Sequence, residues 1–114
     1  MTDIWRGFIA QRCLWEMGYH LVFHAAEVDQ ARNEHNLLQD LEDEIPGYLN
    51  NHRIVAGLES LSLRGGEESA SDNLLQCYEL LVRIGVIPEK ELGLVQAWLA
   101  DLAVLQPNAA AAIV

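Results

Sequence analysis

The pattern of apolar and polar positions first predicts a helix over residues 4–17, whose apolar side chains surround most of the helix axis. Its polar members are Arg6, Gln11, Arg12 and Glu16. A helix that is apolar on most sides is typical of a buried position, which is difficult to provide in a chain of 114 residues. We therefore expect it to pack against neighbours outside this chain, with Asp3 as its N-cap and Gly18 after its last turn.

Residues 19–24 alternate between two faces, which predicts a short strand, and residues 25–35 are expected to form a loop. A helix is predicted over residues 36–44, with an interruption at Pro46-Gly47 and a continuation to about residue 63. The side chains expected to face inward in this region are Leu49, Ile54, Leu58 and Leu61.

Two further helices are predicted in the C-terminal part of the chain. Apolar residues recur at helical spacing over residues 72–84, and Gly85 is expected to end this helix. Pro88 suits the first turn of a second helix over residues 89–105, which Pro107 is expected to end.

The predicted fold class is therefore mainly α, with four to five helices and one short strand or hairpin. We expect one compact domain overall. Its predicted parts are a helix, strand and helical region over 1–63, a linker or turn over 64–72, a helical hairpin over 73–106 and a tail over 107–114.

The charge of the chain is strongly negative, with seventeen acidic and seven basic side chains and a formal net charge of −10. Such a field repels phosphate backbones and anionic membranes at long range, which disfavours nucleic acid as a partner. The acidic run at Asp40, Glu42, Asp43 and Glu44 is interpreted as a solvated helix face.

Cys13 and Cys77 belong to no motif with metal-ligand spacing, so two reduced, buried thiols are expected rather than a disulfide. Charged residues interrupt the first fifteen positions, which argues against a signal peptide. No apolar run approaches the roughly 20 residues that cross a bilayer. We therefore expect a cytoplasmic protein.

His20 and His24 have the spacing of a metal-binding pair on a helix, but on the predicted strand they lie about 13 Å apart, too far for one ion. A site that combines one of them with Asp29 or His35 stays open, and surface histidines without a ligand are the simpler interpretation. No metal ligand is assigned.

The stretch RNEHN, residues 32–36, concentrates an arginine, a histidine and two asparagines. It could bind a phosphate or sugar hydroxyls through charge-assisted hydrogen bonds. The alternative is that Asn33 or Asn36 caps the following helix. The chain has no phosphate-cradling glycine loop and no arrangement typical of nucleophilic catalysis.

The N-terminal stretch DIWRGFIAQRCLWEMGYHLVF resembles the segment DIWRxY…QRLLWExGxxLVxY of STELLO-type glycosyltransferases. It is more distantly similar to the DDMWAGW region of plant reversibly glycosylated polypeptides, the UDP-arabinopyranose mutases. The resemblance is specific over residues 3–24 and weaker to residue 63. The matching residues are Asp3, Ile4, Trp5, Arg6, Gly7, Gln11, Arg12, Leu14, Trp15, Glu16, Gly18, Leu21 and Val22.

The resemblance implies the C-terminal, acceptor-side part of a GT-A-type domain, without the half that binds nucleotide sugar. By the same resemblance Asp3 is the candidate general base. The residues implied in acceptor binding are Trp5, Arg6, Arg32, Asn33 and His35. No cofactor is expected in the isolated chain, and a divalent metal and a UDP-sugar are expected only if a partner supplies the missing half.

Three functional hypotheses follow from the sequence. The first is a detached acceptor-side segment of a glycosyltransferase-like protein that is inactive alone and self-associates or binds a missing N-terminal catalytic half. The second is a small helical interaction module that hides its surplus apolar helix surface in a homo-oligomer. The third is a helix-turn-helix or winged-helix protein in which Arg6, Arg12 and Arg32 cluster, which the net charge disfavours.

Overall fold

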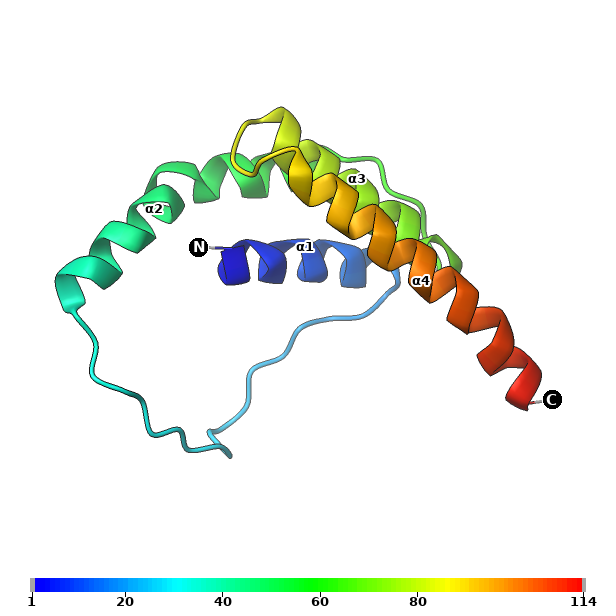
Figure 1. Ribbon diagram of the computed structural model, residues 1–114, viewed down its shortest axis with the longest axis horizontal. Helices are drawn as coiled ribbons and strands as arrows, with labels where there is room; N and C mark the ends of the chain where they lie inside the picture. The colour runs from blue at the N-terminus through cyan, green and yellow to red at the C-terminus, as the bar shows by residue number, and fades with distance from the viewer. Residues whose placement is uncertain (1, 114) are drawn as a thin grey trace.

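The structure, a computed structural model, describes residues 2–113 and the side chains of residues 3–106. Four α-helices and one short 3-10 helix make up the regular structure of this part of the chain (Figure 1). Their bounds are Thr2–Glu16 for α1, Leu37–Ser60 for α2, Glu67–Ser69 for η1, Ala70–Arg83 for α3 and Lys90–Ile113 for α4. The prediction of a mainly α fold with four to five helices is confirmed.

The predicted strand over residues 19–24 is wrong. This stretch lies within an irregular connection from residue 17 to residue 36, which sweeps away from the helices (Figure 1). A strand needs a neighbouring strand for its backbone groups, and residues 2–113 contain none. The alternating pattern therefore buries neither face, and Phe23 is 94% exposed.

The two glycines predicted to follow helices are both confirmed by their backbone geometry. Gly18 and Gly85 have φ angles of 85° and 80°, a conformation that side chains disfavour. After α1, the Tyr19 amide donates to the Leu14 carbonyl oxygen at 2.9 Å. After α3, the Val86 amide donates to Leu81 in the same way at 3.1 Å, so both helices end in a Schellman motif.

The ends predicted for two other helices need correction. Helix α1 already includes Thr2, so Asp3 lies in its first turn instead of acting as the N-cap. Helix α4 continues through Pro107 to Ile113 instead of ending at the proline. Four consecutive alanines follow at residues 109–112, and alanine has the highest intrinsic helix propensity.

Helix α2 is continuous, so the predicted interruption at Pro46-Gly47 is wrong. Asn36 caps it, because its side-chain oxygen accepts hydrogen bonds from the amides of Leu38 (3.1 Å) and Gln39 (3.3 Å). Pro46 lies inside the helix and cannot donate a backbone hydrogen bond. The helix absorbs the proline by bending, which is visible as an arc in Figure 1.

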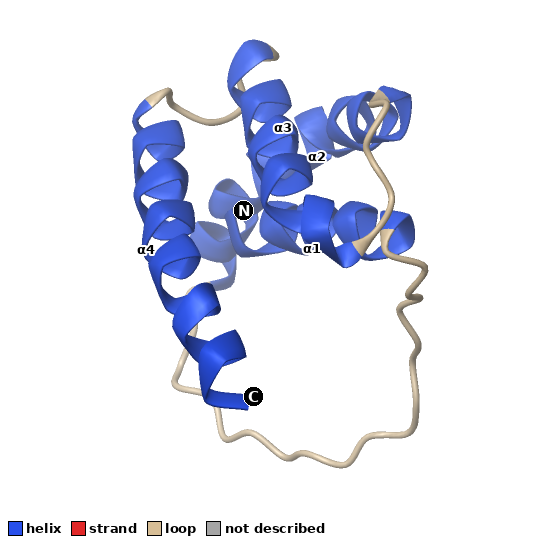
Figure 2. Cartoon of the chain, turned by 90° about the vertical axis from the view of Figure 1, so that its right-hand side faces the viewer, coloured by secondary structure: helices blue, strands red, loops and turns tan. Residues whose placement is uncertain are grey.

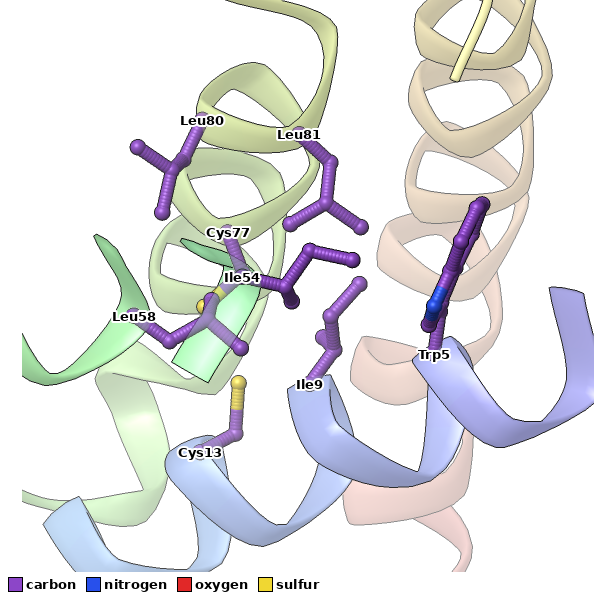
Figure 3. Close-up of a cluster of buried hydrophobic side chains, with 8 residues drawn as sticks. All are labelled: Trp5, Ile9, Cys13, Ile54, Leu58, Cys77, Leu80 and Leu81. Carbon is purple, nitrogen blue, oxygen red and sulfur yellow. The ribbon is translucent and has the colours of Figure 1, made fainter. Parts of the chain in front are cut away.

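The core lies where α1 and α3 meet the C-terminal half of α2 (Figure 3). Its members are Trp5, Ile9, Cys13, Ile54, Leu58, Cys77, Leu80 and Leu81. Gly57 allows the close approach of α2 to α3, because a Cβ atom there would lie 2.9 Å from Leu80 Cδ2. The inward positions predicted at Ile54 and Leu58 are confirmed, whereas Leu49 is exposed because it precedes the part of α2 that meets the core.

Helix α1 is buried on one face only, although its apolar residues surround the axis. Trp5, Ile9 and Cys13 point into the core, while Ile4 and Trp15 on other faces remain 50% and 45% exposed. The described part of the chain therefore leaves some of the apolar surface of α1 uncovered, as expected for a chain of this length.

Within residues 2–113, helix α4 packs against α3 and against no other helix. Val95 is its buried anchor. Figures 1 and 2 both show the C-terminal part of α4 extending past the other helices.

Arg12 ties α1 to the end of α2. Its buried guanidinium donates from Nε to the Leu58 carbonyl oxygen and from Nη2 to the Leu61 carbonyl oxygen, each at 2.8 Å. Its Nη1 atom donates to Glu16 Oε1 at 2.7 Å. The last carbonyls of a helix lack intrahelical partners and carry its negative dipole end, so the cation satisfies both needs.

Asn73 holds the connection that follows α2 against α3. Its side chain is completely buried, and Nδ2 donates to the Arg64 carbonyl oxygen at 2.7 Å. Its Oδ1 atom accepts from the Arg64 amide at 3.1 Å. These two hydrogen bonds satisfy the donor and the acceptor of the Asn73 side-chain amide, as a neighbouring backbone peptide group would.

The molecule is open for its length. Its radius of gyration is 16.9 Å, whereas roughly 13 Å is typical of a compact domain of this size. Its accessible surface is 8680 Å², against roughly 6300 Å² for a compact monomer of this mass. The additional accessible surface lies mainly on the exposed connection, the N-terminal half of α2 and the part of α4 that extends past the other helices (Figure 1).

We expect Arg12→Ala to lower the free energy of unfolding by about 3 kcal/mol, because it leaves two helix-end carbonyls and Glu16 without their partner. Urea denaturation measures this change. The control is Arg6→Ala on the same helix, whose exposed side chain should contribute less than about 0.5 kcal/mol. Equal effects of the two substitutions would mean that the hydrogen bonds of Arg12 do not stabilise the contact between α1 and α2.

Candidate functional site

An open hollow lies between the start of α1, the end of the 17–36 connection and the N-terminal half of α2. Its volume is about 450 Å³. It is lined by Asp3, Ile4, Arg32, His35, Asp40, Asp43 and Glu44. Three of the residues selected from the sequence, namely Asp3, Arg32 and His35, are therefore brought together although they come from separate parts of the chain.

Asp3 reaches the hollow from the first turn of α1, and its side chain is fully exposed. A carboxylate at this end of a helix is stabilised by the positive end of the helix dipole. Arg6 Nη1 lies 4.0 Å from Asp3 Oδ1, one turn further along α1. Arg6 therefore adjoins the hollow through Asp3 and does not line it.

His35 and Arg32 approach the hollow from the connection, just before Asn36 caps α2. His35 Nδ1 lies 3.6 Å from Asp40 Oδ2, which forms an ion pair when the imidazole is protonated. Of the two asparagines considered as the cap of α2, Asn36 is the one that caps it. Asn33 is exposed and does not line the hollow.

The acidic run is solvent-accessible, as interpreted from the sequence, and Glu42, Asp43 and Glu44 are exposed. What the sequence interpretation missed is that Asp40, Asp43 and Glu44 line the hollow. Their spacing of three and four residues was the available signal, because it places side chains on one side of a helix. The contact with the connection that encloses them could not be inferred from that spacing.

A second hollow of about 230 Å³ shares Ile4 and Glu44 with the first and adds Tyr48 and Asn51. The Tyr48 hydroxyl donates a hydrogen bond to Glu44 Oε2 at 2.8 Å. This hydrogen bond and the negative charge of Glu44 raise the pKa of Tyr48. Glu44 therefore has an anchored position at the boundary of the two hollows.

The electrostatics of the larger hollow favour neutral or cationic ligands. Four carboxylates line it, against one guanidinium and one imidazole. Carboxylates accept hydrogen bonds from hydroxyl groups, and Arg32 can donate to a ligand oxygen. The excess of negative charge would repel a diphosphate.

Trp5 does not line the hollow. It is a core residue, and its indole Nε1 donates to Asn51 Oδ1 on α2 at 2.9 Å (Figure 3). Arg12 is buried as well, so Arg6, Arg12 and Arg32 do not form one exposed basic surface.

Within the described residues, no group of three or more histidine, cysteine or acidic side chains is placed to hold a metal ion. His20 and His24 lie in the irregular connection, where His24 Nδ1 is 2.8 Å from the Ala25 carbonyl oxygen. None of the helices within residues 2–113 combines the length and the apolar character needed to cross a membrane.

The two cysteines are free and buried, as predicted. Cys13 on α1 and Cys77 on α3 belong to the same core cluster (Figure 3). The hydrogen bond with Cys13 and the burial of the thiol raise the pKa of Cys77. The thiolate is the nucleophilic form of cysteine, so Cys77 is not suited to nucleophilic catalysis.

Comparison with known protein families gives one match. The sequence profile of the family described as STELLO glycosyltransferases matches residues 1–113. No curated protein and no solved structure matches the chain.

We expect the Trp5–Asn51 hydrogen bond to show as coupling in a double-mutant cycle. Trp5→Phe and Asn51→Ala should each lower the free energy of unfolding, with a coupling of about 1 kcal/mol between them. The matched control pairs Trp15→Phe, on the exposed part of α1, with Asn51→Ala and should be additive. An additive result for Trp5 would mean that its ring, and not its hydrogen bond, joins the two helices.

Proposed function

Because the chain belongs to the STELLO glycosyltransferase family, we propose that it is the acceptor-side segment of a glycosyltransferase-like protein. The observation that carries this proposal is the convergence of Asp3, Arg32 and His35 on one open hollow. Asp3 belongs to the family-like motif, whereas the other two come from the RNEHN stretch about thirty positions later.

In the proposed reaction the hollow holds a hydroxyl-bearing acceptor. Asp3 accepts the proton of the reacting hydroxyl as general base, a role that requires direct hydrogen bonding to that group. Arg32 and His35 donate hydrogen bonds to other acceptor oxygens, while Asp40 and Asp43 accept from neighbouring hydroxyls. Trp5 contributes by fixing α1 against α2, and Arg6 by its proximity to Asp3.

In this proposal the nucleotide sugar and any divalent metal bind to a separate catalytic half, not to this chain. The negative hollow does not suit a diphosphate, and no metal-binding group is present among the described residues. The segment is therefore proposed to be inactive alone and to work with a GT-A-type catalytic half. The two free thiols favour a reducing compartment, which supports the cytoplasm as the proposed location.

We further propose that the chain self-associates through α4. Leu94, Trp98 and Leu105 remain more than half exposed on this helix and share one flank, about a quarter turn around the axis from the Val95 anchor. Trp98 is a large aromatic residue of the kind enriched at interface centres. The same exposed surface supports the alternative function, a small helical interaction module.

The acceptor site is tested by mapping NMR chemical-shift changes as a neutral monosaccharide is added to the full chain. Changes are expected around Asp3, Arg32 and His35, and Asp3→Asn should weaken binding about fivefold or more, because it removes a charge-assisted hydrogen bond. Asp72→Asn, at an exposed first-turn position of α3, is the control and should bind normally. Shifts that avoid the hollow would overturn the assignment.

Self-association is tested by sedimentation velocity at several concentrations. Trp98→Asp should raise the dimer dissociation constant by about tenfold or more, because it places a charge in an apolar contact. Leu21→Asp, in the exposed connection, should leave it unchanged. A monomeric wild-type chain at high micromolar concentration would refute the proposed dimer.

A further inference from the structure

Helix α2 has two apolar faces, of which the core uses only one. Ile54 and Leu58 are buried against α1 and α3. Ile45 precedes Ile54 by nine positions, about two and a half helical turns, so the two side chains leave opposite sides of the helix. The N-terminal half of α2 therefore presents a second apolar face, which is exposed and meets another helix only where Tyr48 borders the smaller hollow with Ile4 of α1.

This outer face has the spacing of a coiled-coil seam. Its members are Leu38, Leu41, Ile45 and Tyr48, here called the α2 outer stripe. They follow one another at intervals of three, four and three residues, which is the alternation of the a and d positions in a heptad. All four are exposed, between 45% and 78% of their surface. A regular repeat of large apolar residues in solvent marks a surface for another helix.

The residues that flank the stripe decide what kind of helix fits it. Glu42 and Glu44 occupy the e and g positions of the same heptad. A second copy docked on this stripe would bring the carboxylates of Glu42 and Glu44 against the same carboxylates across the seam. A helix with lysine or arginine at its flanks would instead form ion pairs across the seam.

We infer that the α2 outer stripe docks an amphipathic helix of another polypeptide, with leucine or isoleucine at its a and d positions and basic residues beside them. Pro46 and Gly47, at b and c positions, lie away from the seam. This docking surface does not depend on the transferase function proposed above.

The test uses three labelled synthetic peptides of three heptads and the full chain, with fluorescence anisotropy as the measurement. The first peptide has leucine at a and d and lysine at e and g, the second has glutamate in place of lysine, and the third has serine in place of leucine. We expect the lysine–leucine peptide to bind at least about tenfold more tightly than the other two. Its affinity should fall as salt screens the charge pairs.

Variants of the full chain locate the binding surface. Leu41→Asp should weaken binding of the lysine–leucine peptide by about tenfold or more, whereas Leu94→Asp on α4 should leave it unchanged. Glu42→Lys combined with Glu44→Lys should reverse the preference toward the glutamate peptide. Circular dichroism checks that Leu41→Asp, at an exposed position, retains the helical content of the wild type.

Three results would overturn the inference. Equal binding of the lysine–leucine and lysine–serine peptides would mean that only net charge is recognised. Loss of peptide binding in Leu94→Asp but not in Leu41→Asp would place the surface on α4. A dimer that Leu41→Asp dissociates, without any peptide binding, would assign the stripe to a second copy of the chain.

Discussion

The buried guanidinium of Arg12 is the constraint on which the arrangement of the first two helices depends. It satisfies two carbonyls at the end of α2 while Glu16 balances its charge from α1. These two residues are the arginine and glutamate of the QRCLWE stretch, so this part of the family-like motif has a structural role. A buried cation needs such complete pairing, which explains why the two residues are one helical turn apart.

The same arrangement creates the hollow. Arg12 joins the C-terminal half of α1 to the end of α2, and the Trp5–Asn51 hydrogen bond joins the N-terminal half of α1 to the middle of α2. With these two points held, Asp3 faces the acidic turn of α2, and the connection returns Arg32 and His35 to the same place. The polar residues of the N-terminal motif thus divide into Trp5, Arg12 and Glu16, which hold helices together, and Asp3, whose exposed side chain lines the hollow.

The apolar residues that remain outside the core lie on three separate surfaces of the molecule. Trp98 and its exposed neighbours lie on one flank of α4, the α2 outer stripe lies outside the core, and Phe23 lies on the open connection. Such surface is costly in a monomer, since apolar area in water contributes no stabilisation. The open shape and these exposed faces are the observations from which the two proposed interactions are argued.

The sequence alone predicted those structural features that depend on interactions between neighbouring residues. The Gly18 and Gly85 helix ends and the helical spacing in α3 follow from the residues alone, because neighbouring backbone groups satisfy one another there. The sequence left the cap of α2 open between Asn33 and Asn36, and the structure selects Asn36. The strand over residues 19–24 was mispredicted because alternation requires a partner strand, and the break at Pro46 because the helix could bend. The face of α1 that enters the core, the choice of Asp40 and Asp43 as hollow residues and the burial of Trp5 depend on contacts between distant segments, which no local pattern encodes.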